Sequence, residues 1–175
     1  IAACLGSVGY LRQEPDLMLL ADTVREELCW KNKTITEEQV ERLLEQLNLT
    51  EYAEDFPLAL SKGQRLRVVL GAMLAKQPKL LLLDEHTAAL DPKTAHKVLE
   101  LTQHFVERDH LTTFMVTHNM KHAIHYGNRL IMLHDGHVIL DIAGEEKKKL
   151  TVPDLLEQFT KASGDEFAND RAILS

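Results

Sequence analysis

The sequence predicts an α/β fold built on a parallel sheet with an antiparallel ending, and three patterns indicate it. A short apolar run, Lys79–Asp84 (KLLLLD), follows a proline, which is typical of a strand buried on both faces. Strand and helix patterns alternate around it, as they do where helical crossovers join parallel strands. Near the end, Asp135-Gly136 separates two strand patterns and indicates a tight hairpin turn.

Before the apolar run, the chain is predicted to be mostly helical. We expect one strand over Leu5–Arg12 and a largely helical segment over residues 14–60, where Asp22 or Thr23 caps a short helix, VREEL. A longer helix follows Thr36, which stands at capping-box spacing from a glutamine. Its apolar residues recur on one helix face, and they are Val40, Leu43, Leu44 and Leu47.

The helices and strands after residue 60 are predicted from similar local signals. Ser61 and Gln64 form a second capping-box pair and open a helix expected over Ser61–Lys76. Asp91-Pro92 opens another, because a capping acid followed by proline marks a helix start. The inner face of that helix is expected to hold Ala95, Val98, Thr102 and Phe105. A strand over Thr112–Thr117 should follow it.

The last part of the chain contains the predicted hairpin. A helix is expected near Asn119–Tyr126, and the hairpin strands over Arg129–His134 and His137–Ile142. We interpret the charge run Glu145–Lys149 as a solvated linker. A final helix should begin at Thr151 and end in a loosely held tail.

Composition excludes some classes of protein. With 175 residues, 45% of them hydrophobic, the chain has material for one core rather than two. A formal net charge of −7 argues against a nucleic-acid binder with a broad basic surface. No apolar stretch of about 18 residues occurs, so a membrane role would require a partner. Because the chain begins at Ile1 without a leader-like segment, we expect a fragment of a longer, cytosolic protein; the isolated Cys4 and Cys29 agree with reducing surroundings.

Two places carry candidate chemistry. Asp84 and Glu85 end the apolar run, where α/β folds bind ligands; the first could hold Mg²⁺ and the second could orient a water nucleophile. In the turn Leu60–Arg65 (LSKGQR), Ser61 offers a hydroxyl and Gly63 permits close approach of a phosphate to a helix N-terminus. The alternatives are a strand that ends in surface acids and an ordinary serine cap.

Five motifs, in order and over nearly the whole chain, resemble those of ABC-type ATPases, the motors of membrane transporters. Gln13 in RQEP resembles the Q-loop, LSKGQR the signature motif and LLLLDE the Walker B motif. AALD, ending at Asp91, resembles the D-loop, and VTH, ending at His118, the switch histidine. The resemblance implies a P-loop NTPase core of parallel strands with an inserted helical subdomain.

The resemblance also implies domain boundaries. Residues 1–13 would end the core segment that leads into the Q-loop, and residues 14–77 would form the helical subdomain with the signature helix. Residues 78–144 would complete the α/β core, followed by a C-terminal helix and tail over residues 145–175.

ATP and Mg²⁺ are the cofactors that the resemblance implies. Gln13 and Asp84 would contact Mg²⁺, Glu85 would be the general base, and His118 would contact the γ-phosphate. Members of the family hydrolyse ATP as head-to-tail dimers, in which the signature residues bind the ATP of the opposite subunit. Here these residues would be Ser61, Lys62, Gly63 and Gln64. Asp91 would join the two sites across the interface.

The sequence departs from the family pattern in three places. Lys62 stands where glycine is commonest, and His86 replaces the usual proline after the acid pair. No G-x-x-x-x-G-K-[ST] loop occurs, although its backbone and lysine supply most phosphate binding in P-loop enzymes. We therefore expect the chain alone neither to bind ATP tightly nor to hydrolyse it. Because the strand before that loop belongs to the central sheet, apolar edges and faces should also lie uncovered.

The implied partners are a second ATPase subunit, identical or related, transmembrane permease subunits and, in importers, a solute-binding protein. The chain would lie on the cytoplasmic face of the membrane, with the segment Gln13–Trp30 against the permease. Its first half resembles energy-coupling-factor ATPases, and its second half resembles ATPases of tryptophan/tyrosine-type importers, so an importer is favoured and the solute stays open. No nucleic acid is expected.

Three other hypotheses remain. The first is an ABC ATPase outside transport, and the second is a non-catalytic interaction subunit without a P-loop. The third concerns His118, His122 and His125, whose i, i+4, i+7 spacing could place them on one helix face as metal ligands. Without a cysteine or acid to complete the site, ordinary polar helix residues are favoured.

Overall fold

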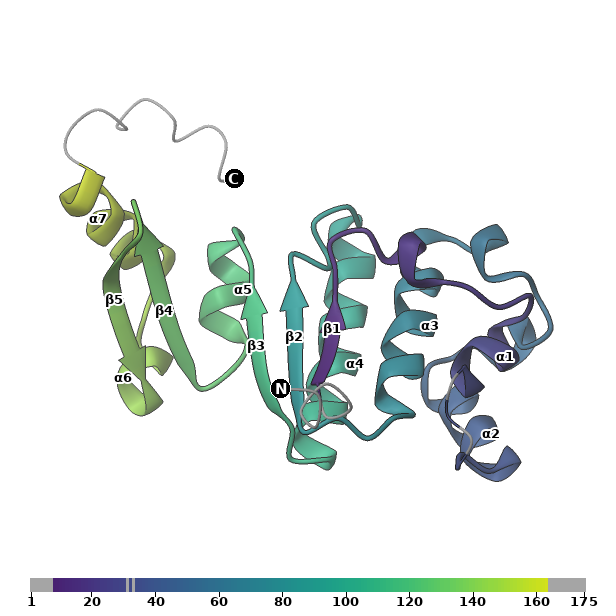
Figure 1. The fold of residues 1–175 in the computed structure, drawn as a ribbon. Coiled ribbons are helices and arrows are strands. Elements are labelled where there is room, and N and C mark those ends of the chain that lie inside the picture. Colours follow the sequence, from purple (N-terminus) through teal and green to yellow (C-terminus); the bar gives the residue numbers. More distant parts are fainter. Residues whose placement is uncertain (1–7, 31, 33, 164–175) are drawn as a thin grey trace. The chain divides into compact units, whose positions relative to one another are not determined.

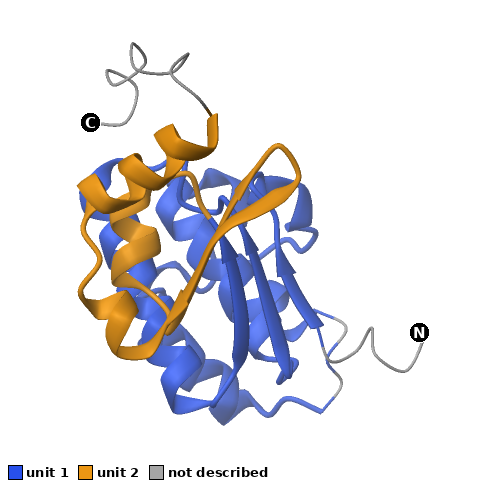
Figure 2. Cartoon of the chain, turned by 90° about the vertical axis from the view of Figure 1, so that its left-hand side faces the viewer, with its two compact units in different colours: residues 1–116 blue, residues 117–175 orange. Residues whose placement is uncertain are grey.

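The structure is a computed structural model that describes residues 8–30, 32 and 34–163. It divides into two compact units, residues 1–116 and 117–175, coloured blue and orange in Figure 2. Three expectations fall outside the described residues: the start of the first strand, the surroundings of Cys4 and the tail.

Unit 1 contains a three-stranded parallel sheet, which confirms the predicted fold class (Figure 1). Its order is β1 (Val8–Leu11), β2 (Leu80–Asp84), β3 (Thr112–Val116). Leu11 is paired with Leu83, and Asp84 with Val116. All three strands therefore end at the same edge of the sheet.

The two faces of this sheet differ, which corrects the prediction that Lys79–Asp84 is buried on both faces. Leu81 and Leu83 are buried against the helices, whereas Leu80 and Leu82 are only half-buried. Their neighbours on the more open face include Phe114, which is 58% exposed. An apolar run cannot reveal this difference, because alternate side chains of a strand point to opposite faces whatever covers them.

The predicted helical segment consists of short elements. They are η2 (Pro15–Met18), α1 (Val24–Cys29), α2 (Glu37–Gln46), η3 (Thr50–Tyr52) and η4 (Pro57–Ala59), followed by α3 (Lys62–Leu74). Thr23, rather than Asp22, caps α1. Both predicted capping boxes are present, at Thr36 and Ser61. Each start is fixed because two backbone N–H groups gain partners at once.

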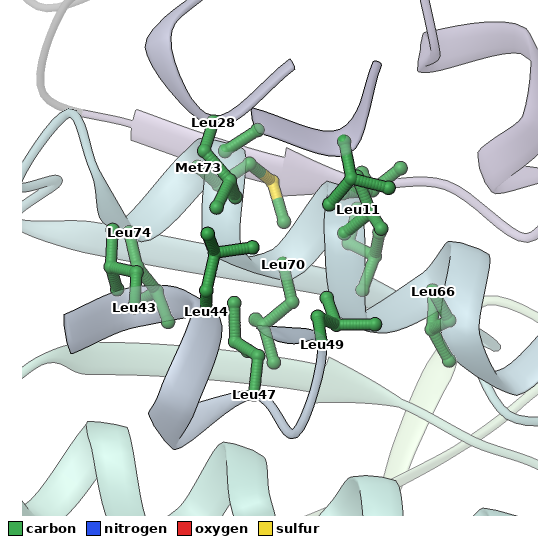
Figure 3. Packing of buried hydrophobic residues seen from close by; sticks show 14 of the residues in the cluster. Leu11, Leu28, Leu43, Leu44, Leu47, Leu49, Leu66, Leu70, Met73 and Leu74 are labelled. Carbon is green, nitrogen blue, oxygen red and sulfur yellow. The ribbon is translucent and has the colours of Figure 1, made fainter. Parts of the chain in front are cut away.

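A single hydrophobic core lies between these helices and the sheet (Figure 3). Helix α3 runs through it and contributes Leu66, Leu70 and Met73, with Leu44 and Leu47 coming from the α2 region. The next helix, α4 (Pro92–Arg108), begins after its Asp91 cap and buries all four residues predicted for its inner face: Ala95, Val98, Thr102 and Phe105.

Unit 2 contains a hairpin and three helices: α5 (Met120–His125), β4 (Arg129–His134), β5 (His137–Ala143), α6 (Gly144–Lys148) and α7 (Val152–Ser163). The hairpin turn is confirmed, with φ of 47° at Asp135 and 76° at Gly136, as a type I′ turn requires. The predicted linker Glu145–Lys149 is wrong, because most of it forms α6. Lys147 of that helix is buried and donates hydrogen bonds to the carbonyl oxygens of Ile124 and Tyr126.

The outer strands β1, β3, β4 and β5 each have one edge without a strand partner among the described residues. Strand β3 pairs only with β2, and β4 pairs only with β5. Within the same part of the chain, none of the helices has the length and apolar character that a bilayer crossing needs.

Candidate functional site

The acid pair lies where strand β2 ends. Asp84 is the last residue of the strand, half-buried, and its Oδ2 accepts a hydrogen bond of 3.1 Å from the hydroxyl of Tyr10 on β1. This hydrogen bond raises the pKa of Tyr10. The Asp84 carboxylate is therefore directed to the open face of the sheet, beside the neighbouring strand.

Glu85 occupies an unusual backbone conformation. Its φ is 43°, in the left-handed region that non-glycine residues rarely adopt. Its N–H donates to the carbonyl oxygen of Val116 at 3.1 Å, and its carbonyl oxygen accepts from the N–H of Ala88 at 2.9 Å. The chain therefore turns sharply at the second acid, and such outliers concentrate at functional sites.

Gln13 reaches the same edge of the sheet from β1. It is exposed and comes two residues after Leu11, the register partner of Leu83. Carboxylate and amide oxygens are ligands that Mg²⁺ accepts, so Gln13 and Asp84 fit part of its coordination shell. Because no group of three His, Cys, Asp or Glu side chains comes together among the described residues, the remaining ligands would be water or phosphate oxygens.

The signature turn is a separate surface at the start of α3. Ser61 and Lys62 are exposed, whereas Gly63 is buried. The Ser61 hydroxyl donates a hydrogen bond to Oε1 of Gln64 at 2.6 Å, and Ser61 Oγ accepts one from the backbone N–H of Gln64 at 3.4 Å. An incoming phosphate would therefore compete with this capping box for the Ser61 hydroxyl.

Sequence reasoning missed a contact that links this turn to the segment after Gln13. The Arg65 guanidinium lies 2.8 Å from Oδ2 of Asp16 in η2, with the Arg65 side chain only 17% exposed. The two residues are 49 positions apart and no local pattern connects them. The ion pair ties the first turn of α3 to the end of the Q-loop segment.

Asp91 caps helix α4. Its Oδ1 accepts the N–H of Thr94 at 3.0 Å, and hydrogen bonding from Thr94 lowers the pKa of the Asp91 carboxyl. The side chain is exposed, so its second oxygen can still accept from a partner. An interface role for Asp91 stays a prediction, as do the roles of the other candidate residues.

His118 lies in unit 2, in the turn between β3 and α5. It is exposed, and polar contacts fix the turn around it: Thr117 Oγ1 accepts the N–H of Asn119 at 3.1 Å, and Asn119 caps α5. The acid pair lies in unit 1.

The three-histidine metal hypothesis is not supported. His118 precedes α5, so the three side chains do not share a helix face. His122 and His125 instead make edge-to-face ring contacts with Tyr126, at 6.0 and 4.8 Å between ring centroids. Within the described residues, no cluster of potential metal ligands forms.

Comparisons with known proteins agree on one relationship. Residues 2–88 match the family model described as ABC transporter. The chain is 50% identical over 136 residues to a tyrosine transport ATP-binding protein of Clostridioides difficile, and 35% identical over 146 residues to an energy-coupling factor transporter ATP-binding protein of Ligilactobacillus salivarius. The fold resembles that of cbiO1 from Clostridium perfringens, part of the ABC transporter complex cbiONQ, with a TM-score of 0.73 at 24% identity.

Coverage differs between the two sides of these comparisons. The matches cover 77% and 79% of this chain but 53% and 50% of the two relatives, so the chain spans about half their length. For the solved structure, the shares are 89% of this chain and 64% of that one.

Proposed function

We propose that the chain forms part of an ATPase that drives import of a solute, because residues 2–88 match the ABC transporter family model and its relatives include ATP-binding proteins of transporters. The observation that carries the proposal is the shared edge of β1 and β2. There Gln13, Asp84 and the sharply turned Glu85 follow neighbouring parallel strands, which is where such folds bind nucleotides and metals.

Each residue at this edge has a proposed task. Gln13 and Asp84 hold Mg²⁺, which when bound neutralises charge that develops on the phosphates. Glu85 accepts a proton from the attacking water, at the point where the chain turns sharply out of β2. His118 contacts the γ-phosphate from unit 2.

The signature turn acts on a second nucleotide. Ser61, Lys62 and Gln64 contact the phosphates of ATP held by another ATPase subunit, identical or related, and Asp91 contacts that subunit. The exposure of Ser61, Lys62 and Asp91 supports this assignment. The subunit pair would close on ATP and open after hydrolysis.

The P-loop is proposed to come from a segment outside residues 1–175. Two features support this: the sequence contains no G-x-x-x-x-G-K-[ST] loop, and β3 and β4 each have an edge without a strand partner in the described part of the chain.

An importer is the favoured setting, because relatives include tyrosine, methionine and energy-coupling factor transport proteins. The proposed partners are permease subunits at the inner face of the membrane, contacted through residues 13–30, and a solute-binding protein where the importer uses one. Exposed apolar side chains in that segment, Leu17 and Leu20, support the assignment.

Steady-state ATP hydrolysis tests the proposal. The chain alone should show no turnover above background, whereas the chain extended by a P-loop segment should hydrolyse ATP. In the extended protein, Glu85→Gln should lower turnover by about 10²–10⁴-fold through loss of the general base. ATP-dependent dimerisation should remain.

Glu51→Gln is the matched control, because Glu51 is exposed in η3, away from the acid pair in sequence and fold. Its turnover should equal that of the unsubstituted protein. Turnover by the chain alone would show that a P-loop is dispensable. Equal turnover for Glu85→Gln and Glu51→Gln would remove Glu85 from its proposed role.

A further inference from the structure

Gly63 is buried although Ser61 and Lys62, the two residues before it, are exposed. A Cβ atom built at Gly63 would lie 2.4 Å from Cγ2 of Thr94, and the next nearest atom is Cβ of Thr94 at 3.9 Å. Real Cβ contacts are essentially never shorter than 3.0 Å. A single methyl group, on a residue outside every recognised motif, therefore occupies the space that a side chain at position 63 would need.

Thr94 has little freedom to move away. Its backbone N–H is held by the Asp91 cap at 3.0 Å, and Pro92 fixes the first turn of α4. The next residue, Ala95, is buried. The Thr94 side chain also hydrogen-bonds the Asp91 carboxyl, so rotating its methyl group aside would break that hydrogen bond.

The opposite side of the turn is also held. Arg65, two residues after Gly63, forms the 2.8 Å ion pair with Asp16 beyond the Q-loop. The first turn of α3 thus lies between two anchors, one on the segment that follows Gln13 and one on the helix that follows Asp91.

We propose that Thr94 is a positioning residue that holds the signature turn against the start of α4, and that this contact is one reason why position 63 is glycine. The contact makes the signature turn and the D-loop move as one piece, so a shift of either is transmitted to the other. Its consequence for turnover rests on the proposed function, whereas the packing itself does not.

Paired substitutions distinguish two reasons for glycine at position 63: packing against Thr94 and close approach of a nucleotide phosphate. Gly63→Ala should lower the melting temperature of the chain by about 3–10 °C, as overpacking does. Adding Thr94→Ala removes the obstructing methyl group and should restore most of that loss. The control pair, Gly63→Ala with Thr94→Val, keeps a methyl group at the same place and should restore nothing.

Two further measurements report on positioning. Thr94→Ala alone should leave the melting temperature nearly unchanged but speed hydrogen exchange of the amides in the first turn of α3. In the protein extended by a P-loop segment, Thr94→Ala should lower kcat/KM for ATP about tenfold. The Gly63→Ala/Thr94→Ala double variant should have a kcat/KM at least about tenfold higher than Gly63→Ala alone.

Two results would overturn the inference: no loss of melting temperature in Gly63→Ala, or no recovery in the double variant. Recovery of melting temperature without recovery of ATPase activity would also overturn the positioning role, since glycine would then be needed at the nucleotide. If the extended protein hydrolyses no ATP at all, the proposed function fails, while the melting and exchange measurements still decide whether the contact exists.

Discussion

The two compact units are stabilised in different ways. Unit 1 has a continuous core of leucine and valine side chains that joins the sheet to α1, α2, α3 and α4. Among the described residues of unit 2, the buried apolar side chains are Tyr126, Leu130 and Leu155. The hairpin strands are also joined by the exposed ion pair of Arg129 and Asp141, 2.6 Å apart.

The difference bears on how each unit could act in an ATPase. Burial of apolar surface is the main source of stability, so the large core of unit 1 should stabilise the elements that carry the acid pair and the signature turn. Exposed ion pairs contribute about 0–1 kcal/mol each, so unit 2, which carries His118, should open more readily. The residue proposed to contact the γ-phosphate, His118, therefore lies on the unit with fewer buried apolar side chains among those described.

The largest test of this comparison is Leu70→Ala. Leu70 is fully buried in α3, and removing three heavy atoms from a packed core costs about 2–5 kcal/mol of unfolding free energy. Hydrogen exchange of β2 and α3 should accelerate accordingly, measured by mass spectrometry on the native protein.

Leu155→Ala is the matched change in unit 2, where Leu155 is 2% exposed. Exchange should accelerate in α5, α7 and the hairpin, while α3 keeps its protection. If both variants accelerate exchange equally in both units, the units unfold together and the comparison is wrong.

Much of this architecture could be predicted because its signals are local. The capping boxes at Thr36 and Ser61, the Asp91-Pro92 helix start and the Asp135-Gly136 turn each depend on residues within a few positions of one another. The acid pair was recognisable for the same reason, since a buried strand that ends in carboxylates is a short pattern.

Other features depend on packing between distant elements and could not be predicted. The Arg65–Asp16 ion pair and the Gly63–Thr94 contact exist only because α3 lies between η2 and α4. The one-sided burial of Leu81 and Leu83 was hidden by apolar residues at alternate positions of the strand. Lys147 was misread because a charge run usually indicates solvent, and nothing nearby marks the carbonyl oxygens that it reaches.

A second test concerns the buried charge of unit 1. One carboxylate oxygen of Glu27, a residue only 3% exposed, accepts the N–H groups of Leu20 at 2.7 Å and Ala21 at 2.8 Å. Glu27→Ala leaves the buried N–H of Ala21 without its acceptor, at a cost of about 1–3 kcal/mol, and the part-buried N–H of Leu20, which costs less because water can reach it. Unfolding free energy should therefore fall by about 2–4 kcal/mol in urea titration.

The adjacent exposed residue supplies the control. Glu26→Ala should change stability by less than about 0.5 kcal/mol, as surface substitutions usually do. Similar losses in both variants would point to a general effect of negative charge on α1 rather than to the loop that Glu27 holds.

The smallest expected effect belongs to Lys147, the buried charge of unit 2. Burial lowers the pKa of its amine, and the amine donates to the carbonyl oxygens of Ile124 and Tyr126 at the end of α5. Lys147→Met keeps most of the apolar stem but removes the donor, which should cost about 1–2 kcal/mol. Exchange should accelerate at the end of α5 and in α6.

Lys148→Met is the matched control, because Lys148 is exposed and pairs only with the exposed Glu145 on its own helix. It should leave exchange in α5 unchanged. Since α5 begins directly after the turn that carries His118, loosening its far end also tests whether the position of His118 depends on α6. If Lys147→Met accelerates exchange in α3 as much as in α5, the smaller core of unit 2 does not make it the less stable unit.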